Sequence, residues 1–381
     1  MRKDKINLAL LWSEYEGKVT SVNDLVLGLE KERFNIIFIY LSGYGVDENL
    51  IEEAGYKVFY LSNIKLINAF RFSILFKLIK ILKDHKVDVL HCHVHKPTVY
   101  GVMAARFAGT RVVLSHVHGL GRSRNFRRRL TNFLLSRQCS RIISVANGVK
   151  ADVLRNNWHM PAEKVAVLEN SVDYERFAEA SVDKAEARRM LGISPDAFVF
   201  GTVGRLAPTK GLGFLIEAFS IAKEEIPSAQ LVLLGNGPSR AELEQQASKT
   251  SCRDSIHFLG HRDNIEQLYR AMDVFVLSSV AEGMPRAILE AMAAGVPCIA
   301  TQVGGIPEIF NSPEVGLLVS ARDPQALARA MLELSEITGE QLEKRAEKAS
   351  SRVRRLYSHD IVREKLRKLY ESELETSCRG R

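Results

Sequence analysis

The sequence predicts an α/β protein made of two domains, each a doubly wound parallel sheet with helices on both faces. Short apolar runs of strand length alternate with helical patterns along the chain. The 381 residues are enough for two domains of ordinary size, each with its own core. A polar stretch ends near residue 196, and we expect domains at residues 1–178 and 179–358, followed by a charged helical end at 359–381.

Seven strands are expected in the first domain, because each apolar run is continuous, as in strands that are buried on both faces. They span residues 5–12, 35–41, 57–61, 88–91, 111–115, 141–145 and 165–168. Helical patterns occupy residues 22–29, 48–54, 70–85 and 149–155. Ligands of open parallel sheets bind at the carboxyl ends of the strands, so the loops after these strands are candidate binding loops.

The second domain repeats this alternation. Strands are expected at residues 198–203, 230–234, 274–277 and 297–301, with a further strand and turn at 256–261. A helix is expected at residues 214–222, and the chain from residue 338 onward is helical and charged.

The most informative stretch is residues 282–297, which lie between two of these strands. Glu282 lies in the loop at the carboxyl end of a strand, and Glu290 follows in the helix that ends at Gly295 and Pro297. Two carboxylates there can accept hydrogen bonds from sugar hydroxyls, and the helix N-terminus offers N–H groups to an anion. Two ordinary surface acids are the alternative, and the flanking Gly-x-Pro and Ala-Met-Ala-Ala-Gly-x-Pro patterns favour a binding site.

A second motif, Gly-Arg-Leu-Ala-Pro-Thr-Lys-Gly, occupies residues 204–211 after the first strand of the second domain. It places Arg205 and Lys210 in a loop that precedes a helix. A diphosphate requires compensating cations and N–H donors, and this loop can provide both. Solvated surface cations are the alternative, but the spacing before Glu282 favours diphosphate binding.

These two motifs resemble the Glu-x7-Glu region and phosphate loop of retaining nucleotide-sugar glycosyltransferases with the GT-B architecture, which include bacterial lipopolysaccharide and mannosyl transferases. The resemblance implies an α/β GT-B fold, in which two Rossmann-like domains face each other across a cleft. It implies that the first domain binds the acceptor and the second the nucleotide sugar. It also implies that the terminal helix crosses back to the first domain, with residues 360–375 as the candidate.

The resemblance implies a role for each motif residue. Glu282 and His118 would be catalytic: Glu282 would hold hydroxyls of the donor sugar, and His118, in a loop that carries His116 at the usual Thr position, would orient that sugar. The implied donor-binding residues are Arg205, Lys210, Glu290, Gly17, Gly283, Met284, Pro285, Gly235 and Asn236. A satisfied loop histidine is the alternative for His118, and a simple turn residue is the alternative for Gly17.

Three histidines alternate at the end of the fourth expected strand, as His91-x-His93-x-His95. Residues two apart on a strand share a face, and imidazole is a good metal ligand. No Cys, Asp or Glu completes a metal site at a clear spacing, and a similar pattern occurs without metal in the related transferases. We therefore expect no metal here, and no essential divalent ion or other cofactor for transfer.

The charge of the chain is unevenly distributed. The formal net charge is +8, and the interval between Asp88 and Asp152 holds eleven Lys and Arg but no Asp or Glu. Five of these arginines cluster at the start of a helical pattern: Arg122, Arg124, Arg127, Arg128 and Arg129. Such a face requires an anionic partner, and we expect an anionic membrane surface or an acceptor phosphate. A core-packed helix with a solvated end is the alternative.

The expected function is retaining transfer of a sugar from a nucleotide-diphosphate sugar, with UDP favoured over GDP, to a lipid-linked saccharide in cell-surface polysaccharide synthesis. No apolar run reaches membrane-spanning length, and the five scattered cysteines form no C-x-x-C pair. We expect a cytoplasmic enzyme on the inner face of the cytoplasmic membrane, with no nucleic-acid partner. The alternatives are a sugar-nucleotide epimerase or phosphorylase on the same fold, or a nucleic-acid-binding protein.

Overall fold

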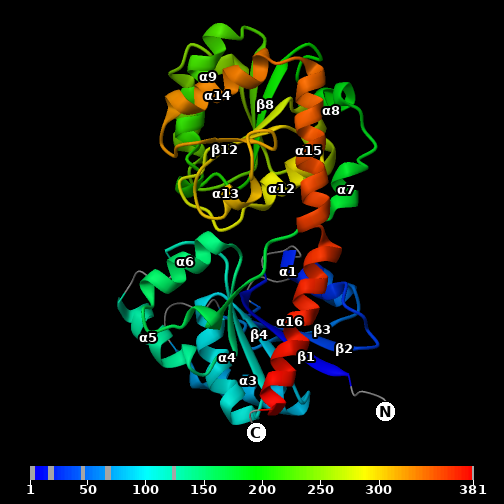
Figure 1. The fold of residues 1–381 in the computed structure, drawn as a ribbon, viewed down its shortest axis with the longest axis vertical. Coiled ribbons are helices and arrows are strands. Elements are labelled where there is room, and N and C mark those ends of the chain that lie inside the picture. Colours follow the sequence, from blue (N-terminus) through cyan, green and yellow to red (C-terminus); the bar gives the residue numbers. More distant parts are fainter. Residues whose placement is uncertain (1–4, 16–20, 44–47, 65–69, 122–125, 380–381) are drawn as a thin grey trace. The chain divides into compact units, whose positions relative to one another are not determined.

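The structure is a computed structural model that describes residues 5–15, 21–43, 48–64, 70–121 and 126–379. The chain forms two compact units, one of Met1–Glu169 with Asp360–Arg381 and the other of Asn170–His359. Each unit is a parallel sheet with helices on both faces (Figure 1). The predicted architecture of two Rossmann-like, doubly wound sheets is therefore confirmed.

The division after Glu169 comes earlier than the expected boundary at residue 178. Helix α7 (Tyr174–Ala178) packs against α12 (Arg286–Ala293) of the second unit. In addition, the Tyr174 hydroxyl and Ser350 Oγ are hydrogen bonded at 2.8 Å. The polar composition that suggested a linker begins after this helix, whereas the contacts place the helix itself in the second unit.

All strands of the first sheet are parallel, in the order β3-β2-β1-β4-β5-β6-β7. Their bounds are β1 (Ile6–Glu14), β2 (Phe34–Ser42), β3 (Lys57–Tyr60), β4 (Val89–His93), β5 (Val112–Val117), β6 (Arg141–Ser144) and β7 (Val165–Val167). The strand order reverses between β1 and β4. Such a switch point is where open α/β sheets bind ligands, and Trp12 and His93 lie near the carboxyl ends of these two strands.

Helices cover both faces of the first sheet. They are α1 (Ser21–Leu27), α2 (Leu50–Glu53), α3 (Phe72–Asp84), α4 (His95–Ala108), α5 (Phe126–Ser136), α6 (Asn147–Asn156) and the terminal α16 (His359–Arg379). Leu78 of α3 and Tyr100 of α4 belong to the core on one face, and Leu366 and Tyr370 of α16 belong to the core on the other. From Asp360 onward, the terminal helix is part of the first unit.

Helix α4 was not among the expected elements. It is buried over most of its length, including Tyr100, Val102, Ala104 and Ala105. A helix that is buried on most sides lacks the contrast between apolar and polar faces on which helix prediction from sequence depends.

The second sheet is also all parallel, in the order β10-β9-β8-β11-β12-β13, with its switch point between β8 and β11. Its strands are β8 (Phe198–Val203), β9 (Ala229–Leu234), β10 (Ile256–Gly260), β11 (Val274–Leu277), β12 (Cys298–Thr301) and β13 (Leu317–Val319). Its helices besides α7 and α12 are α8 (Lys184–Leu191), α9 (Leu212–Glu225), α10 (Arg240–Ser248), α11 (Ile265–Leu268), α13 (Ile306–Ile309), α14 (Pro324–Glu336) and α15 (Gly339–Tyr357). No helix in the described part of the chain is both long and apolar enough to cross a membrane.

Candidate active site

Loops at the carboxyl edge of the second sheet approach each other so closely that only glycine fits. A Cβ on Gly235 would lie 1.9 Å from the carbonyl oxygen of Gly204, and a Cβ on Gly304 would lie 2.0 Å from that of Glu282. The Gly305 N–H donates to the carbonyl of Gly283 at 2.7 Å. Glycine therefore holds the loop after β9 against the loop after β8, and the loop after β12 against the loop after β11.

Lys210 and Glu282 join the two motifs that the sequence singles out. Lys210 Nζ donates to Glu282 Oε1 at 2.5 Å, and Ser279 Oγ donates to the same oxygen at 2.7 Å. The two charged side chains are only 22% and 12% exposed. Salt screens a partly buried pair of this kind less than a surface pair, so the carboxylate is held in one orientation. Oε2 of Glu282 makes no hydrogen bond within the described residues.

Arg205 is the second cation of this loop. Its side chain is exposed and has no hydrogen-bond or ion-pair partner in the part of the chain that the structure describes. It lines a small pocket together with Lys210 and Gly204. The carbonyl of Asn236 accepts the backbone N–H of the residue after Arg205, at 3.0 Å, so the Gly235–Asn236 turn supports the loop. The site thus offers one cation that is fixed by Glu282 and one that remains available.

Glu290 lies on α12, one turn after the N-terminus of the helix. The hydroxyl of Tyr269 donates to Glu290 Oε2 at 3.0 Å, and Arg286 Nε lies 3.7 Å from Oε1. Burial, followed by the charge of Glu290, raises the pKa of Tyr269 well above its usual value. The phenol therefore remains a hydrogen-bond donor and orients the carboxylate.

The segment between the two glutamates is fixed through its backbone. Gly283, Met284 and Pro285 are buried, and Pro285 is the N-cap residue of α12. Asn170 Nδ2 donates to the carbonyl of Met284 at 2.7 Å. The structure therefore brings the predicted donor-binding residues of the second unit, from Arg205 to Glu290, to one edge of one sheet.

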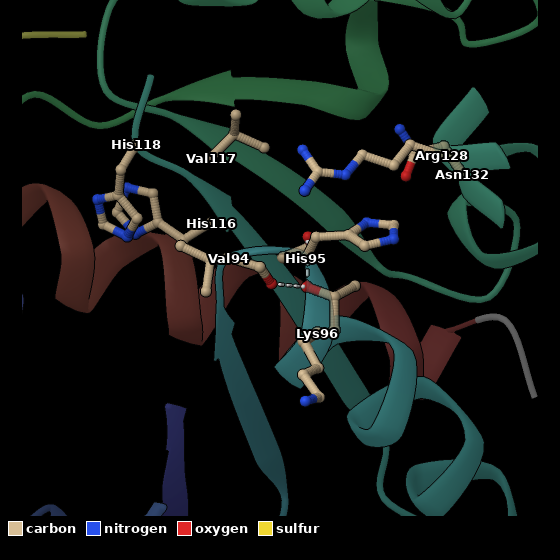
Figure 2. Close-up of a pocket in the computed structure, with 10 residues that line it drawn as sticks. Val94, His95, Lys96, His116, Val117, His118, Arg128 and Asn132 are labelled. Carbon is tan, nitrogen blue, oxygen red and sulfur yellow. Dashed lines mark hydrogen bonds between the residues drawn. The ribbon is translucent and has the colours of Figure 1, made fainter. Parts of the chain in front are cut away.

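In the first unit, His118 lines a pocket at the carboxyl ends of β4 and β5 (Figure 2). Figure 2 shows the imidazoles of His116 and His118 together on one side, with His95 and Arg128 on the other. Burial, and then the charge of Arg128, lower the pKa of His95. No carboxylate from the described residues lines this pocket, so its electrostatic environment favours an anion.

His118 belongs to a stack of rings. Its Nε2 lies 3.2 Å from Nδ1 of His93, and the His93 ring is stacked on Trp12 with the centroids 3.8 Å apart. The rings of His116 and His118 are 4.2 Å apart between centroids. His118 is therefore oriented by neighbouring rings.

His95 alternates with His91 and His93 in the sequence but does not share a strand with them in the structure. Strand β4 ends at His93, and Val94 adopts a φ of 63° before His95 begins α4. A positive φ is unfavourable for a β-branched residue and turns the chain out of the strand. His95 therefore lines the pocket from the start of a helix.

Helix α5 carries three large apolar side chains on its exposed face, so the core-packed alternative is wrong for these residues. Phe126 is 76% exposed, Leu130 is 52% exposed and Leu134 is 58% exposed, and they follow one another at a spacing of four. Phe133 faces the other way, in ring contact with His159. Trp158, directly before His159, is 90% exposed.

Two basic residues of the cluster, Arg128 and Arg129, are exposed on the same helix. Gly17, Arg122, Arg124 and the side chain of Arg127 lie outside the described residues. The charge excess is smaller than the sequence suggests, because Arg111 pairs with Asp88 and Arg141 pairs with Glu373 of α16.

Comparison with known proteins identifies the class. Residues 15–176 match the family described as "Glycosyltransferase Family 4", and residues 183–352 match "Glycosyl transferases group 1". A UDP-Gal:alpha-D-GlcNAc-diphosphoundecaprenol alpha-1,3-galactosyltransferase of Escherichia coli is 31% identical over 284 residues, 72% of each chain. The putative glycosyltransferase EpsF of Bacillus subtilis is 29% identical over 74% of this chain and 75% of its own.

Solved structures share the fold. HepE of Anabaena in complex with UDP has a TM-score of 0.83 and 22% identity, over 96% of this chain and 100% of its own. The sucrose-phosphate synthase of Thermosynechococcus elongatus has a TM-score of 0.81 and 20% identity, over 98% and 100%. The chain belongs to the glycosyltransferases that combine a family 4 domain with a group 1 domain. It is an enzyme of the hexosyltransferase class.

Sequence reasoning missed several residues of these sites. Ser279 and Tyr269, which orient the two glutamates, lie outside the motifs and carry no spacing signal of their own. Trp12 reaches His93 only because β1 and β4 are neighbours in the sheet. For Trp12, the strand order was the missing information.

Proposed function

We propose that the enzyme transfers a hexose from a UDP-sugar to a lipid-linked saccharide, with retention of the anomeric configuration, in the synthesis of a cell-surface polysaccharide. The observation that carries this proposal is the Lys210–Glu282 pair, which joins a cationic loop to a carboxylate at the switch point of the second sheet. The E. coli relative is named for a UDP-galactose donor, and a structural neighbour was solved with UDP. Both support UDP as the nucleotide.

Departure of the nucleoside diphosphate concentrates negative charge on its phosphate oxygens. Arg205 is available to bind them directly, and Lys210 adds charge from a position that is set by Glu282. Such interactions strengthen as the leaving-group charge develops, and therefore lower the barrier. With these two cations and the loop N–H groups at the leaving group, transfer requires no divalent ion.

Glu290 and Glu282 have separate roles in this proposal. Glu290, oriented by Tyr269, accepts the ribose hydroxyls, while Glu282 accepts a hydroxyl of the sugar through Oε2. Because Oε1 of Glu282 already accepts from Lys210 and Ser279, this carboxylate is a poor covalent nucleophile. Retention then follows because the acceptor attacks the sugar on the same face from which the diphosphate leaves. His118 of the first unit orients the sugar in this proposal.

Incubation with UDP-glucose, UDP-galactose and UDP-N-acetylglucosamine, each with a diphosphate-linked lipid saccharide, tests the reaction. An α-linked product identified by NMR, with release of UDP and with activity unaffected by EDTA, is the expected result. A β-linked product would contradict retention, and release of free sugar or of an epimer without acceptor would favour a different enzyme on this fold.

The acceptor side of the proposal rests on the first unit. The pocket beside His118 is lined by Lys96, His95 and Arg128, which suit a phosphate, and α5 presents arginines beside an apolar stripe. An amphipathic basic helix of this kind lies in the interface of an anionic membrane, and an exposed tryptophan such as Trp158 is a typical interfacial anchor. We therefore place the enzyme at the inner face of the cytoplasmic membrane.

Flotation with vesicles of phosphatidylglycerol and phosphatidylcholine tests the membrane contact. Phe126→Ser with Leu130→Ser should reduce vesicle binding by about tenfold or more, since each buried apolar side chain contributes about 1.5–3 kcal/mol. Phe76→Ser, at a phenylalanine of α3 that is 66% exposed against 76% for Phe126, is the matched control and should bind as the unchanged protein does. Equal loss in both variants, or no binding by the unchanged protein, would contradict the proposal.

A further inference from the structure

Three buried histidines of the first unit converge beside the pocket of Figure 2. His91 and His93 share one face of β4, and His116 of β5 is in register with His93. One ring nitrogen of each lies within 4.8 Å of those of the other two. All three side chains are buried, with at most 1% exposed. The third histidine comes from the neighbouring strand, which is why the sequence did not complete this group.

In His91 and His93, Nδ1 has a hydrogen-bond partner and Nε2 has none among the described residues. His91 Nδ1 lies 2.8 Å from the hydroxyl of Tyr370, and His93 Nδ1 lies 3.2 Å from Nε2 of His118. Nε2 of His91 and Nε2 of His93 have no hydrogen-bond partner among the described residues. Metal-binding histidines have this arrangement, with one nitrogen on the ion and the other hydrogen bonded to a group that fixes the ring.

An ordinary core role does not account for His116. Neither of its ring nitrogens has a hydrogen-bond partner within the described residues. Each buried polar atom without a partner costs about 1–3 kcal/mol, and buried polar groups are nearly always hydrogen bonded.

We infer that His91, His93 and His116 bind one Zn²⁺ ion. Imidazole nitrogen suits zinc, which takes such ligands at about 2.0–2.1 Å in tetrahedral geometry, so the nitrogens would be about 3.4 Å apart. The nitrogens now lie within 4.8 Å of one another, and the rings of His91 and His116 are stacked nearly parallel, so binding would require these rings to rotate. Three protein ligands leave a fourth position, and since His116 also lines the pocket, this position is reached from there.

The fourth ligand is an anion in this inference. Three neutral imidazoles leave the two positive charges of zinc uncompensated, and no carboxylate from the described residues lines the adjoining pocket. A hydroxide or a phosphate oxygen would compensate part of this charge.

The test uses the full chain without a polyhistidine tag. The protein is stripped with EDTA, reloaded with Zn²⁺, desalted and measured by plasma mass spectrometry. The expected result is one zinc per chain, with an affinity lowered by at least about 100-fold in His91→Gln and His116→Thr and by about 10-fold in Tyr370→Phe. Threonine suits a strand, so His116→Thr should fold. His257→Gln, in the second unit, is the control and should retain full zinc affinity.

Two outcomes would overturn the inference. One is the absence of stoichiometric zinc from the unchanged protein, and the other is equal zinc binding by His116→Thr, Tyr370→Phe and His257→Gln, which would mean an adventitious ion only. The visible absorption spectrum of the unchanged protein loaded with Co²⁺ is a further test that requires no variant, because tetrahedral Co²⁺ gives intense visible bands. Weak octahedral bands would contradict the three-histidine site. None of these readings depends on transferase activity or nucleotide binding.

Discussion

The two units have the same sheet topology at their switch points but carry different chemistry there. In the second unit, the edge between β8 and β11 holds charges that are fixed by hydrogen bonds, with Lys210, Ser279 and Glu282 as the central group. In the first unit, the edge between β1 and β4 holds stacked rings, with Trp12 on His93 and His93 beside His118. The topology decides where a ligand binds, and the side chains decide which ligand it is.

The largest effect is expected from removal of charge in the second unit. Lys210→Met should lower kcat/KM by about 10²–10³-fold, because the lysine acts where leaving-group charge develops and also positions Glu282. Steady-state kinetics with saturating acceptor measure this effect. Lys223→Met, which removes a lysine of α9 outside the site, is the control. A loss of less than tenfold in Lys210→Met would show that the pair is structural only.

The next largest effect is a loss of stability, expected where glycine lets the loops after β8 and β9 of the second unit approach each other. Gly235→Ala would place a Cβ 1.9 Å from a backbone oxygen at a φ of 140°, so the free energy of unfolding should fall by about 2–4 kcal/mol. Gly339→Ala has no atom within 4 Å of the added Cβ and should change stability by less than about 1 kcal/mol. Urea denaturation compares the two. Equal effects would mean that the loops after β8 and β9 separate easily.

A smaller effect is expected at the orienting tyrosine. Tyr269→Phe removes a buried hydroxyl that donates to Glu290, and a hydrogen bond to a charged group contributes about 1.5–3 kcal/mol. We expect UDP affinity to fall by about 3- to 10-fold, less than for Arg205→Ala, because the carboxylate itself remains. Calorimetric titration measures this. Unchanged UDP affinity would remove Tyr269 from the account of the donor site.

The smallest effect is expected from a change to the stacked aromatic rings of the first unit. Trp12→Phe keeps an aromatic ring on His93 but reduces its stacking, which should cost about 0.5–1.5 kcal/mol of stability. UDP binding should not change, because the substitution leaves the donor loops of the second unit intact. An equal loss of UDP affinity in Trp12→Phe and Tyr269→Phe would contradict the separation of the two sites.

Much of this organisation could be predicted from sequence because it depends on local patterns. Most strands of both units were expected from apolar runs. The loop positions of Arg205, Lys210 and Glu282 followed from the strands expected in the second unit. The neighbours of a residue across the sheet could not be predicted, because they depend on strand order. Trp12 was missed for this reason, and His116 was not connected with His91. Ser279 and Tyr269 were missed because they lie outside the motifs and carry no spacing signal of their own.

Other differences have local physical causes. Helix α4 was missed because seven of its 14 residues are buried, which weakens the contrast between an apolar and a polar face. The turn at Val94 could not be predicted because it uses a backbone conformation that valine rarely adopts. Such conformations cluster at functional sites, and this one directly precedes the helix that lines the pocket.

The most direct test of the donor site is thermal stabilisation by UDP, GDP, ADP and CMP, measured on the unchanged protein, on Arg205→Ala, on Glu290→Ala and on the His257→Gln control. A ligand that binds only the folded state adds about 2.7 kcal/mol of stability at 100 times its dissociation constant, a rise of roughly 5 °C in Tm. The account predicts this rise with UDP for the unchanged protein and the control, and its loss in Arg205→Ala and Glu290→Ala. No rise with any nucleotide on folded protein, or an equal rise in all four proteins, would contradict it.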